Sequence, residues 1–300
     1  MSVKVARGSA VDEPKLRSAY PALCVHAPDD GAVSDVGFGS DRPPVDAGGC
    51  PCSVQIPVEH VLEVRSAGRL LMRITCTPVH LAELVVGRLF SEGMIASIDE
   101  LSAVNISADS SVADIVFASG DLPAASSRGE VDVVPTYGTT GRPVPAAERG
   151  AGIAAARDRG EAVWDVESVF SLARVFAADT PIHTATNGAH SCYLAVAGEL
   201  KYCCEDLGRH NALDKVIGSA LLAGDDLSRA LVFSSGRIPA DMIGKVIRAG
   251  IPALVTKAVP TDLAVRMARE AGLVLICSAR PDSIKVFNDP ASFADDGALL

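Results

Sequence analysis

The sequence predicts a two-domain α/β protein, in which a small α+β unit precedes a larger α/β domain. After Asp165, apolar strand-like runs alternate with helix-like segments, a pattern typical of a mostly parallel sheet covered by helices. Before residue 119, short strand-like runs instead cluster around one amphipathic segment. Between these parts, residues 119–164 are rich in Ala, Gly, Pro, Ser and charge, which indicates a linker and loop rather than core.

The N-terminal part divides into a loose segment and the small domain. Residues 1–53 are rich in Gly, Pro, Asp and Ser without sustained periodicity, which indicates a loose lead-in. The small domain is expected to span 54–118. Its expected elements are strands 55–64 and 69–75 joined by a turn at 66–68, a helix that begins at Thr77-Pro78 and ends before Gly93, and strands 101–106 and 112–118.

The larger domain is expected to occupy residues 165–300. Its first helix begins at Asp165, and the residues expected to face the core are Val166, Val169, Phe170, Ala173 and Phe176. A hairpin is expected to follow across Gly198, from strands 192–197 and 199–204. The remaining expected elements are helix 210–223, strand 230–234, helix 239–249, strand 252–256, helix 261–271 and strand 273–277.

Composition excludes several classes of protein. The chain has 300 residues, is 48% hydrophobic and has a formal net charge of −10, which argues against a general nucleic-acid or membrane-surface binder. Its N-terminus lacks a signal-peptide pattern and no apolar run has the length of a membrane span. We therefore expect a cytoplasmic protein. Of its eight cysteines, Cys76, Cys192 and Cys277 are expected to be free, buried thiols.

One charged motif, residues 205–215, interrupts the mainly apolar C-terminal half of the chain. It follows a strand-like run and opens a helix-like one, and ligands of α/β sheets bind at such turns. The alternative is a solvated helix start with ordinary charge pairs. Within the motif, His210 and Asp214 are four residues apart, so the carboxylate is expected to support the imidazole.

Further polar residues directly follow the apolar strands or open a helix. The carboxyl ends of parallel strands meet at one edge of a sheet, so these residues are expected to surround one cleft. Arg237 and Arg280 lie beside small residues, which suggests that they bind phosphate groups together. The alternative is that each arginine caps a helix or pairs with an aspartate. We call this set the rim: His190, Arg209, His210, Arg237, Lys257 and Arg280.

The motif at 205–215, Glu-Asp-Leu-Gly-Arg-His-Asn-Ala-Leu-Asp-Lys, resembles the signature of the formate dehydrogenase accessory sulfurtransferases, the FdhD type. Other segments match the same family in the same order, over about residues 57–287. These are Thr77-Pro78, the run from Gly87 to Ile95, the turn from Thr186 to His190, Ser235-Gly236-Arg237, Lys245, the run from Ala249 to Pro252 and the run from Pro260 to Ala264.

The resemblance implies a fold, a cargo and partners. Its members resemble cytidine deaminases in a three-layer C-terminal domain and form homodimers. They are thought to carry sulfur from a cysteine desulfurase to the Mo-bis(molybdopterin guanine dinucleotide) cofactor, which then enters formate dehydrogenase or a related molybdoenzyme. The family's cofactor-binding segment falls on Ser278, Ala279, Arg280, Pro281, Asp282 and Ser283. The cofactor would be bound as cargo.

The chain departs from this family at its sulfur-carrying loop. The family's two cysteines fall on Tyr137 and Thr140, and neither side chain can hold a persulfide, which requires a thiolate. Candidate substitutes are Cys203 and Cys204, which precede the charged motif, although they also fit as ordinary strand residues near acidic neighbours. Cys50-Pro51-Cys52 is another candidate, for reaching the site or binding a metal, unless these cysteines are incidental.

Two functions remain open, and zinc chemistry is not expected. Deaminases need His-x-Glu and Pro-Cys-x-x-Cys pairs, and the sequence has neither, so no metal site is predicted. The first hypothesis is a sulfurtransferase that carries sulfur on another cysteine. The second is a binding protein that holds the molybdenum cofactor and has lost sulfur transfer. A weaker third is a redox or metal protein that works through Cys50 and Cys52.

Overall fold

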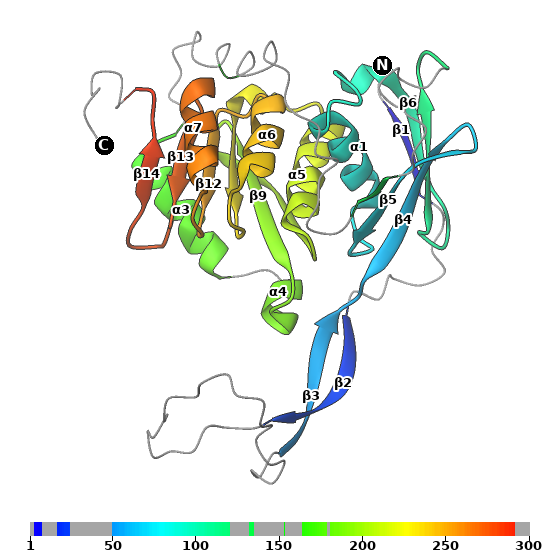
Figure 1. Cartoon of the computed structure of the whole chain (residues 1–300), viewed down its shortest axis with the longest axis horizontal. Coiled ribbons are helices and arrows are strands. Elements are labelled where there is room, and N and C mark those ends of the chain that lie inside the picture. The colour runs from blue at the N-terminus through cyan, green and yellow to red at the C-terminus, as the bar shows by residue number, and fades with distance from the viewer. Residues whose placement is uncertain are drawn as a thin grey trace.

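The computed structural model describes residues 3–7, 17–24, 50–120, 132–134, 153, 164–178 and 181–291. Two six-stranded sheets stand on either side of a pair of helices, α1 (Leu81–Ser91) and α5 (Arg209–Ala223) (Figure 1). The loop that carries Tyr137 and Thr140 lies outside the described residues, as do most of the lead-in and the linker. No described helix has the length and hydropathy needed to cross a membrane.

The N-terminal sheet has the strand order β1-β6-β7-β4-β5-β8. Its strands are β1 (Lys4–Arg7), β4 (His60–Ser66), β5 (Arg69–Cys76), β6 (Leu101–Ile106), β7 (Val112–Phe117) and β8 (Asp132–Val134). The strands predicted at 101–106 and 112–118 are confirmed. Two strands come from segments expected to be loose: β1 pairs with β6, and β8 pairs with β5. Both are too short to show an alternating pattern in the sequence.

The strand predicted at 55–64 is divided between two sheets. Its first part belongs to β3 (Cys50–Pro57), which pairs with β2 (Arg17–Cys24) in a ribbon that projects from the body (Figure 1). Its second part is β4, in the N-terminal sheet. The division falls just after Pro57, where proline has no N–H to donate to a ladder. The lead-in expected to be loose therefore contributes this ribbon.

The C-terminal sheet has the order β10-β9-β11-β12-β13-β14 and is mixed rather than mostly parallel. Only the pairs β11–β12 and β12–β13 are parallel. The hairpin β9–β10 joins one side of this parallel core, and β14, which the sequence pattern missed, closes the other side antiparallel. The strands are β9 (His190–Val196), β10 (Glu199–Asp206), β11 (Ala230–Ser234), β12 (Ala253–Thr256), β13 (Val274–Cys277) and β14 (Lys285–Asn288).

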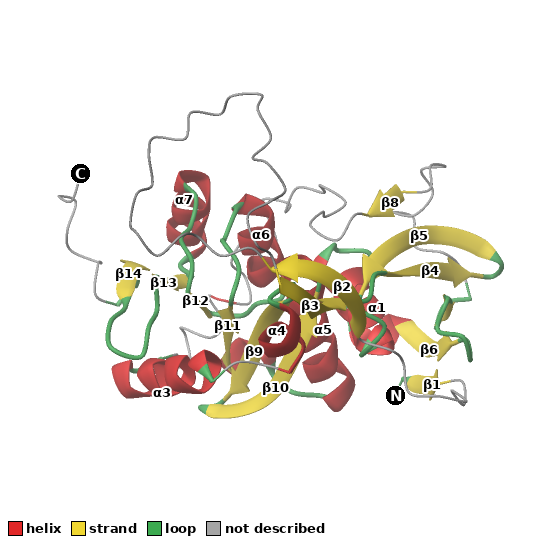
Figure 2. Cartoon of the chain, turned by 90° about the horizontal axis from the view of Figure 1, so that it is seen from below, coloured by secondary structure: helices red, strands yellow, loops and turns green. Residues whose placement is uncertain are grey.

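Helices cover both faces of the C-terminal sheet, in three layers (Figure 2). Alternate strand residues such as Leu194 and Val232 pack with α5, α6 (Ala240–Arg248) and α7 (Asp262–Ala271). The intervening residues pack with α3 (Val166–Ala177), whose Phe176 ring lies 4.5 Å from that of Phe233. Val166 was predicted to face the core but is exposed, because it precedes the packed stripe at the first residue of the helix.

Two glycines let α1 and α5 cross with their backbones in contact. A Cβ atom on Gly87 would lie 1.8 Å from the Asp214 carbonyl oxygen. A Cβ atom on Gly218 would lie 1.9 Å from the Glu83 carbonyl oxygen. Any side chain at either position would therefore force the helices apart. Both helices are buried on almost every side, so their polar side chains must find partners within the protein.

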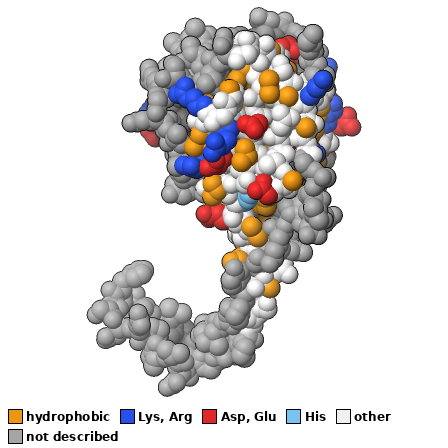
Figure 3. Space-filling model, turned by 90° about the vertical axis from the view of Figure 1, so that its right-hand side faces the viewer, with side chains coloured by type: hydrophobic (Ala, Val, Ile, Leu, Met, Phe, Trp, Pro, Cys, Tyr) orange, Lys and Arg blue, Asp and Glu red, His pale blue; other side chains and the backbone are white. Residues whose placement is uncertain are grey.

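The outer side of the N-terminal domain carries charges of both signs next to one another (Figure 3). Here Glu63 accepts hydrogen bonds from Arg65 and Arg73, and these bonds lower the pKa of its carboxyl group. The exposed apolar residues Val61 and Val116 come from the same sheet. Arg65 and Arg73 are therefore paired with a carboxylate on this sheet.

Candidate functional site

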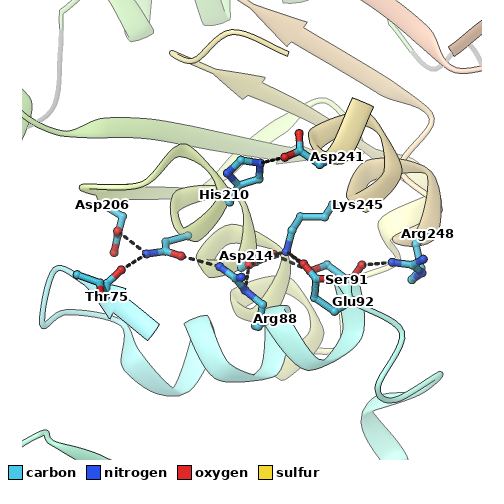
Figure 4. Close-up of polar contacts among 11 residues, drawn as sticks. Thr75, Arg88, Ser91, Glu92, Asp206, His210, Asp214, Asp241, Lys245 and Arg248 are labelled. Atoms are coloured by element: carbon cyan, nitrogen blue, oxygen red, sulfur yellow. Dashed lines mark hydrogen bonds and ion pairs between the residues drawn. The ribbon is translucent and has the colours of Figure 1, made fainter. Parts of the chain in front are cut away.

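The charged motif forms a buried cluster with α1 and α6 (Figure 4). Asp214 is the centre of one half. Its carboxylate pairs with Arg88 Nε at 2.6 Å and with Lys245 Nζ at 2.9 Å, and it accepts a hydrogen bond from Ser91 Oγ at 2.6 Å. Lys245 also pairs with Glu92 at 2.8 Å. These contacts join three helical segments through one carboxylate.

Asp206 is the centre of the other half. Lys215 Nζ lies 2.6 Å from its Oδ2 atom, which also accepts from the backbone N–H of Thr77 at 3.0 Å. Asn211 links the halves, because its Nδ2 donates to Asp206 Oδ1 at 2.8 Å and its Oδ1 accepts from Arg88 at 2.6 Å. Lys215 additionally donates to the carbonyl oxygens of Thr77 and Glu205.

The cluster is a structural connection between the domains rather than an exposed ligand site. Three buried cations, Arg88, Lys215 and Lys245, lie directly against three buried carboxylates, which belong to Glu92, Asp206 and Asp214. Burial, followed by the nearby Arg88 charge, lowers the pKa of Lys245, and Asp214 and Glu92 act in the opposite direction. The interpretation as a solvated helix start is therefore wrong for the buried residues of this motif, whereas the placing of Arg209 and His210 in the rim stays a prediction.

Glu205 connects this cluster to the turn before β9. Its carboxylate accepts the backbone N–H groups of Ile182 and His183 at 2.9 and 2.7 Å, which caps the short helix α4 (Pro181–Thr186). The Thr186-to-His190 turn follows this helix. Glu205 therefore helps to position His190 at the start of β9.

His210 has a different partner from the one that the sequence predicts. Its Nε2 atom lies 3.0 Å from Asp241 Oδ2, on α6 (Figure 4), while Asp214 faces Arg88 and Lys245. The spacing of four residues along α5 predicted the wrong partner because Asp214 is already paired with Arg88 on α1 and with Lys245 on α6. The His210 ring is fully buried, and this burial lowers its pKa despite the opposing effect of Asp241.

The rim residues lie at one end of the C-terminal sheet. His190 begins β9, and Arg237, Lys257 and Arg280 follow β11, β12 and β13. Hydrogen bonds tie these three loops together: Thr256 Oγ1 donates to the Gly236 carbonyl oxygen at 2.8 Å, and the Arg280 guanidinium donates to the Lys257 carbonyl oxygen.

Not every rim side chain faces the same way. Arg237 and Arg280 are exposed, whereas His210 is buried. The Lys257 ammonium lies 5.5 Å from the centre of the Phe176 ring, on the α3 side of the sheet. Ser235 Oγ lies 3.2 Å from His190 Nδ1 and joins that histidine to the Arg237 loop. A common cleft for all six residues stays a prediction.

Comparison with known proteins places the chain in a family. The sequence model of the FdhD/NarQ family matches residues 57–294. The chain belongs to this family.

Relatives of the same family cover most of the chain. "Sulfur carrier protein FdhD" from Sulfurisphaera tokodaii is 34% identical over 237 residues, which are 76% of this chain and 88% of the relative. The protein of the same name from Listeria monocytogenes is 28% identical over 233 residues, covering 78% and 89%. A crystal structure from Desulfotalea psychrophila, described as a candidate formate dehydrogenase accessory protein, matches with a TM-score of 0.64 at 24% identity and covers 92% of this chain and 99% of that one. This structure supports the two-domain α/β fold.

The thiols of this FdhD/NarQ member are poor nucleophiles where the structure describes them. Burial raises the pKa of Cys76, Cys192, Cys204 and Cys277 to about 12. Cys203 is exposed, yet partial burial raises its pKa as well, and nearby Glu205 acts in the same direction. Because the thiolate is the reacting form, these raised pKa values weigh against the five cysteines as persulfide carriers, although a hydrogen bond with Tyr193 opposes the shift at Cys203.

The other candidate cysteines lie on the projecting ribbon. Cys50 and Cys52 belong to β3, and Cys52 is disulfide-bonded. The sequence analysis placed these cysteines in a loose segment, whereas the structure places them in a paired strand. Among the described residues, no group of three or more His, Cys, Asp or Glu side chains is arranged to hold a metal ion.

Sequence analysis missed the residues that complete the buried cluster. Arg88 and Glu92 were noted only as family matches, although charges within an otherwise apolar helix are a signal of buried pairing. Asp241 was not identified as a site residue from the sequence. Asp241 is the second residue of α6, and a carboxylate is common near a helix N-terminus. Its position in the sequence therefore did not indicate a contact with His210.

Proposed function

We propose that this chain serves the maturation of formate dehydrogenase or a related molybdoenzyme by binding the nucleotide part of the Mo-bis(molybdopterin guanine dinucleotide) cofactor at the rim. The observation that carries the proposal is a set of basic side chains at one sheet end of a protein with net charge −10. Phosphate groups are the ligands that such arginines recognise. The names of the relatives support the link to this maturation pathway.

The residues present fit a guanine nucleotide carried as cargo. The family's cofactor-binding segment, Ser278 to Ser283, forms the loop after β13, in which the backbone N–H of Arg280 donates to the Ser283 carbonyl oxygen at 2.8 Å. Only one of its residues, Ala279, is buried in the core. The exposed Arg280 guanidinium supplies a fork of donors suited to a phosphate group.

Sulfur transfer is the second candidate function, and the relatives named as sulfur carriers favour it. In that case a cysteine desulfurase would donate sulfur to this chain. The raised pKa values of the described free thiols weigh against it, as does the replacement of the family cysteines by Tyr137 and Thr140. On these two grounds we propose a cofactor-binding protein that has lost sulfur transfer, with the sulfur carrier of the relatives as the alternative.

Guanosine diphosphate binding tests the proposed function. Calorimetry should detect binding that weakens as salt rises, because the contacts are ionic. Arg280→Ala should lose about 1.5–3 kcal/mol of binding free energy, the usual contribution of a hydrogen bond to a charged group. Arg269→Ala, an exposed arginine at the end of α7, is the control and should bind as wild type does. Absence of binding to the wild-type protein would refute the proposal.

Intact-protein mass spectrometry separates the two candidate functions. The protein is incubated with a cysteine desulfurase and cysteine, and each cysteine is then mapped. Loss of sulfur transfer predicts no added sulfur. A gain of one sulfur atom on a mapped cysteine would favour the sulfur carrier. The homodimer implied by the family resemblance stays a prediction, which sedimentation of the same sample would test.

A further inference from the structure

The N-terminus of α5 carries one cation, Arg209, where a helix disfavours positive charge. Arg209 and His210 are the first two residues of this 15-residue helix, and its first turn has no acidic residue. Gly208, the residue before the helix, offers no side chain to cap the first N–H groups. A helix N-terminus has a partial positive charge, so cations there are destabilising unless an anion lies nearby.

A second observation points to a ligand at the same place. The His210 ring is fully buried, and within the described part of the chain its Nδ1 atom has no hydrogen-bond partner. The buried Nε atom of Arg209 likewise has no partner there. Buried polar atoms are nearly always paired in folded proteins. Two unpaired nitrogens on adjacent residues therefore indicate a site that is completed by a bound group.

The surroundings of Arg209 are basic and closely packed. The loop after β11 lies against it, because a Cβ atom on Gly236 would be only 2.9 Å from Arg209 Cδ. Burial lowers the pKa of Arg209, the positive charge of Arg237 lowers it further, and Asp241 acts in the opposite direction. At this corner of the rim, Arg209 thus lies near one carboxylate, that of Asp241, and near one further cation, Arg237.

We propose that the N-terminus of α5 binds one phosphate group of a nucleotide or diphosphate, through its first N–H groups and the Arg209 guanidinium. This subsite is separate from the Ser278–Ser283 loop. The inference rests on the proposed function only for the identity of the nucleotide, because phosphate recognition follows from the helix N-terminus itself.

His210, the buried second residue of α5, adjoins this subsite. When Nε2 donates its proton to Asp241, the Nδ1 atom of the neutral ring is an acceptor. No hydrogen-bond donor lies beside it among the described residues. A bound anion favours a proton on Nδ1, which makes both nitrogens donors. The charged groups around the ring are Asp241 and Lys245 on α6 and Arg209 on α5. His210 is thus a positioning residue whose protonation follows anion binding.

Titration of the full-length protein with inorganic pyrophosphate tests the subsite. Arg209→Gln should weaken binding about 10- to 100-fold, because a charge-assisted contact is removed. Arg266→Gln is the matched control, since Arg266 is an exposed arginine that pairs with Asp262 on α7. Equal affinity of the Arg209→Gln and wild-type proteins would overturn the inference, as would absence of pyrophosphate binding.

Two more variants separate loss of binding from loss of folding. Asp241→Asn removes the carboxylate that competes with the anion, so pyrophosphate should bind several-fold more tightly, an outcome that structural damage does not produce. His210→Gln should bind less tightly than wild type at pH 6, with a smaller difference at pH 8. Weaker binding by Asp241→Asn, or a His210→Gln difference that does not change with pH, would contradict the proposal.

The outcome also distinguishes this inference from the proposed function. If Arg280→Ala abolishes guanosine diphosphate binding while Arg209→Gln changes nothing, the proposed function stands and the α5 subsite is refuted. If Arg209→Gln abolishes pyrophosphate binding but the protein does not serve formate dehydrogenase maturation, the subsite stands and the proposed function fails.

Discussion

Asp214 is a fully buried carboxylate whose two oxygen atoms satisfy Arg88, Lys245 and Ser91 together. Removing it leaves two cations buried without their counter-charge. We therefore expect Asp214→Ala to reduce the free energy of unfolding by about 3–5 kcal/mol, the usual cost of breaking a buried ion pair. Urea unfolding measures this loss.

An exposed ion pair is the control for that variant. Arg266 lies 2.8 Å from Asp262 on the surface of α7. Arg266→Ala should change the stability by less than about 0.5 kcal/mol, because solvent screens such pairs. If both variants lose similar amounts, the cluster around Asp214 does not hold the domains together as described.

His210 makes the stability of the fold depend on pH. Burial lowers its pKa below the ordinary value of 6.5, so the unfolded chain binds the proton more readily than the folded one. The stabilising effect of the neutral ring is present above pH 6.5 and is lost as pH falls through and below that value. His190 and His80, whose pKa values burial also lowers, act in the same direction.

Unfolding curves at pH 7.5 and 5.5 test this dependence. The wild-type protein should lose stability between these values, and His210→Gln should lose less because it cannot take up that proton. For each protein, the free energy of unfolding at pH 5.5 is subtracted from that at pH 7.5, and the two differences are compared. A loss of stability that the substitution causes equally at both pH values therefore cancels. An equal loss in both proteins would show that His210 is not the residue responsible.

At the scale of the elements, the crossing of α1 and α5 depends on two glycines. In an ordinary exposed helix, replacing glycine by alanine is stabilising by about 0.5–1 kcal/mol. Gly218→Ala should do the reverse, because the new Cβ atom would meet the Glu83 carbonyl oxygen and the Gly87 nitrogen. We expect a loss of about 1–3 kcal/mol or more from overpacking.

The neighbouring residue on α5 gives a control for thermal unfolding. Ser219 is partly buried, and its hydroxyl donates to the Lys215 carbonyl oxygen within the helix and also interacts with the Cys204 side chain. Ser219→Ala should leave the melting temperature close to wild type. A stabilised Gly218→Ala protein would mean that the two helices do not meet as closely as the structure shows.

The sequence predicted the regular elements well where periodicity was strong. The hairpin across Gly198 and the later helices and strands lie within a few residues of their expected bounds. Short strands such as β1 and β8 were missed because four or three residues show no clear alternation. The mixed sheet was missed because pairing direction depends on tertiary contacts, which the sequence pattern does not contain.

The candidate site was predicted less completely than the fold. The order of the strands correctly brought Arg237, Lys257 and Arg280 to one sheet end, because each follows a parallel strand. Partners across the domain boundary could not be predicted. Arg88 lies more than a hundred residues from Asp214 in sequence, and only the packing of α1 on α5 brings them together.

At the scale of the whole molecule, the structure joins a buried, ion-paired interface to an exposed basic sheet end. The first holds the domains in place, and the second is where we propose that the cofactor is bound. The described free thiols are absent from this account, because their raised pKa values disfavour the thiolate that sulfur transfer requires.

Activation of the partner formate dehydrogenase tests this account most directly. Its activity is measured after maturation with wild-type protein, with the double variant Cys203→Ser and Cys204→Ser, and with Arg280→Ala. The account predicts full activity with the double cysteine variant and reduced activity with Arg280→Ala. Loss of activity in the double cysteine variant, with full activity in Arg280→Ala, would contradict it.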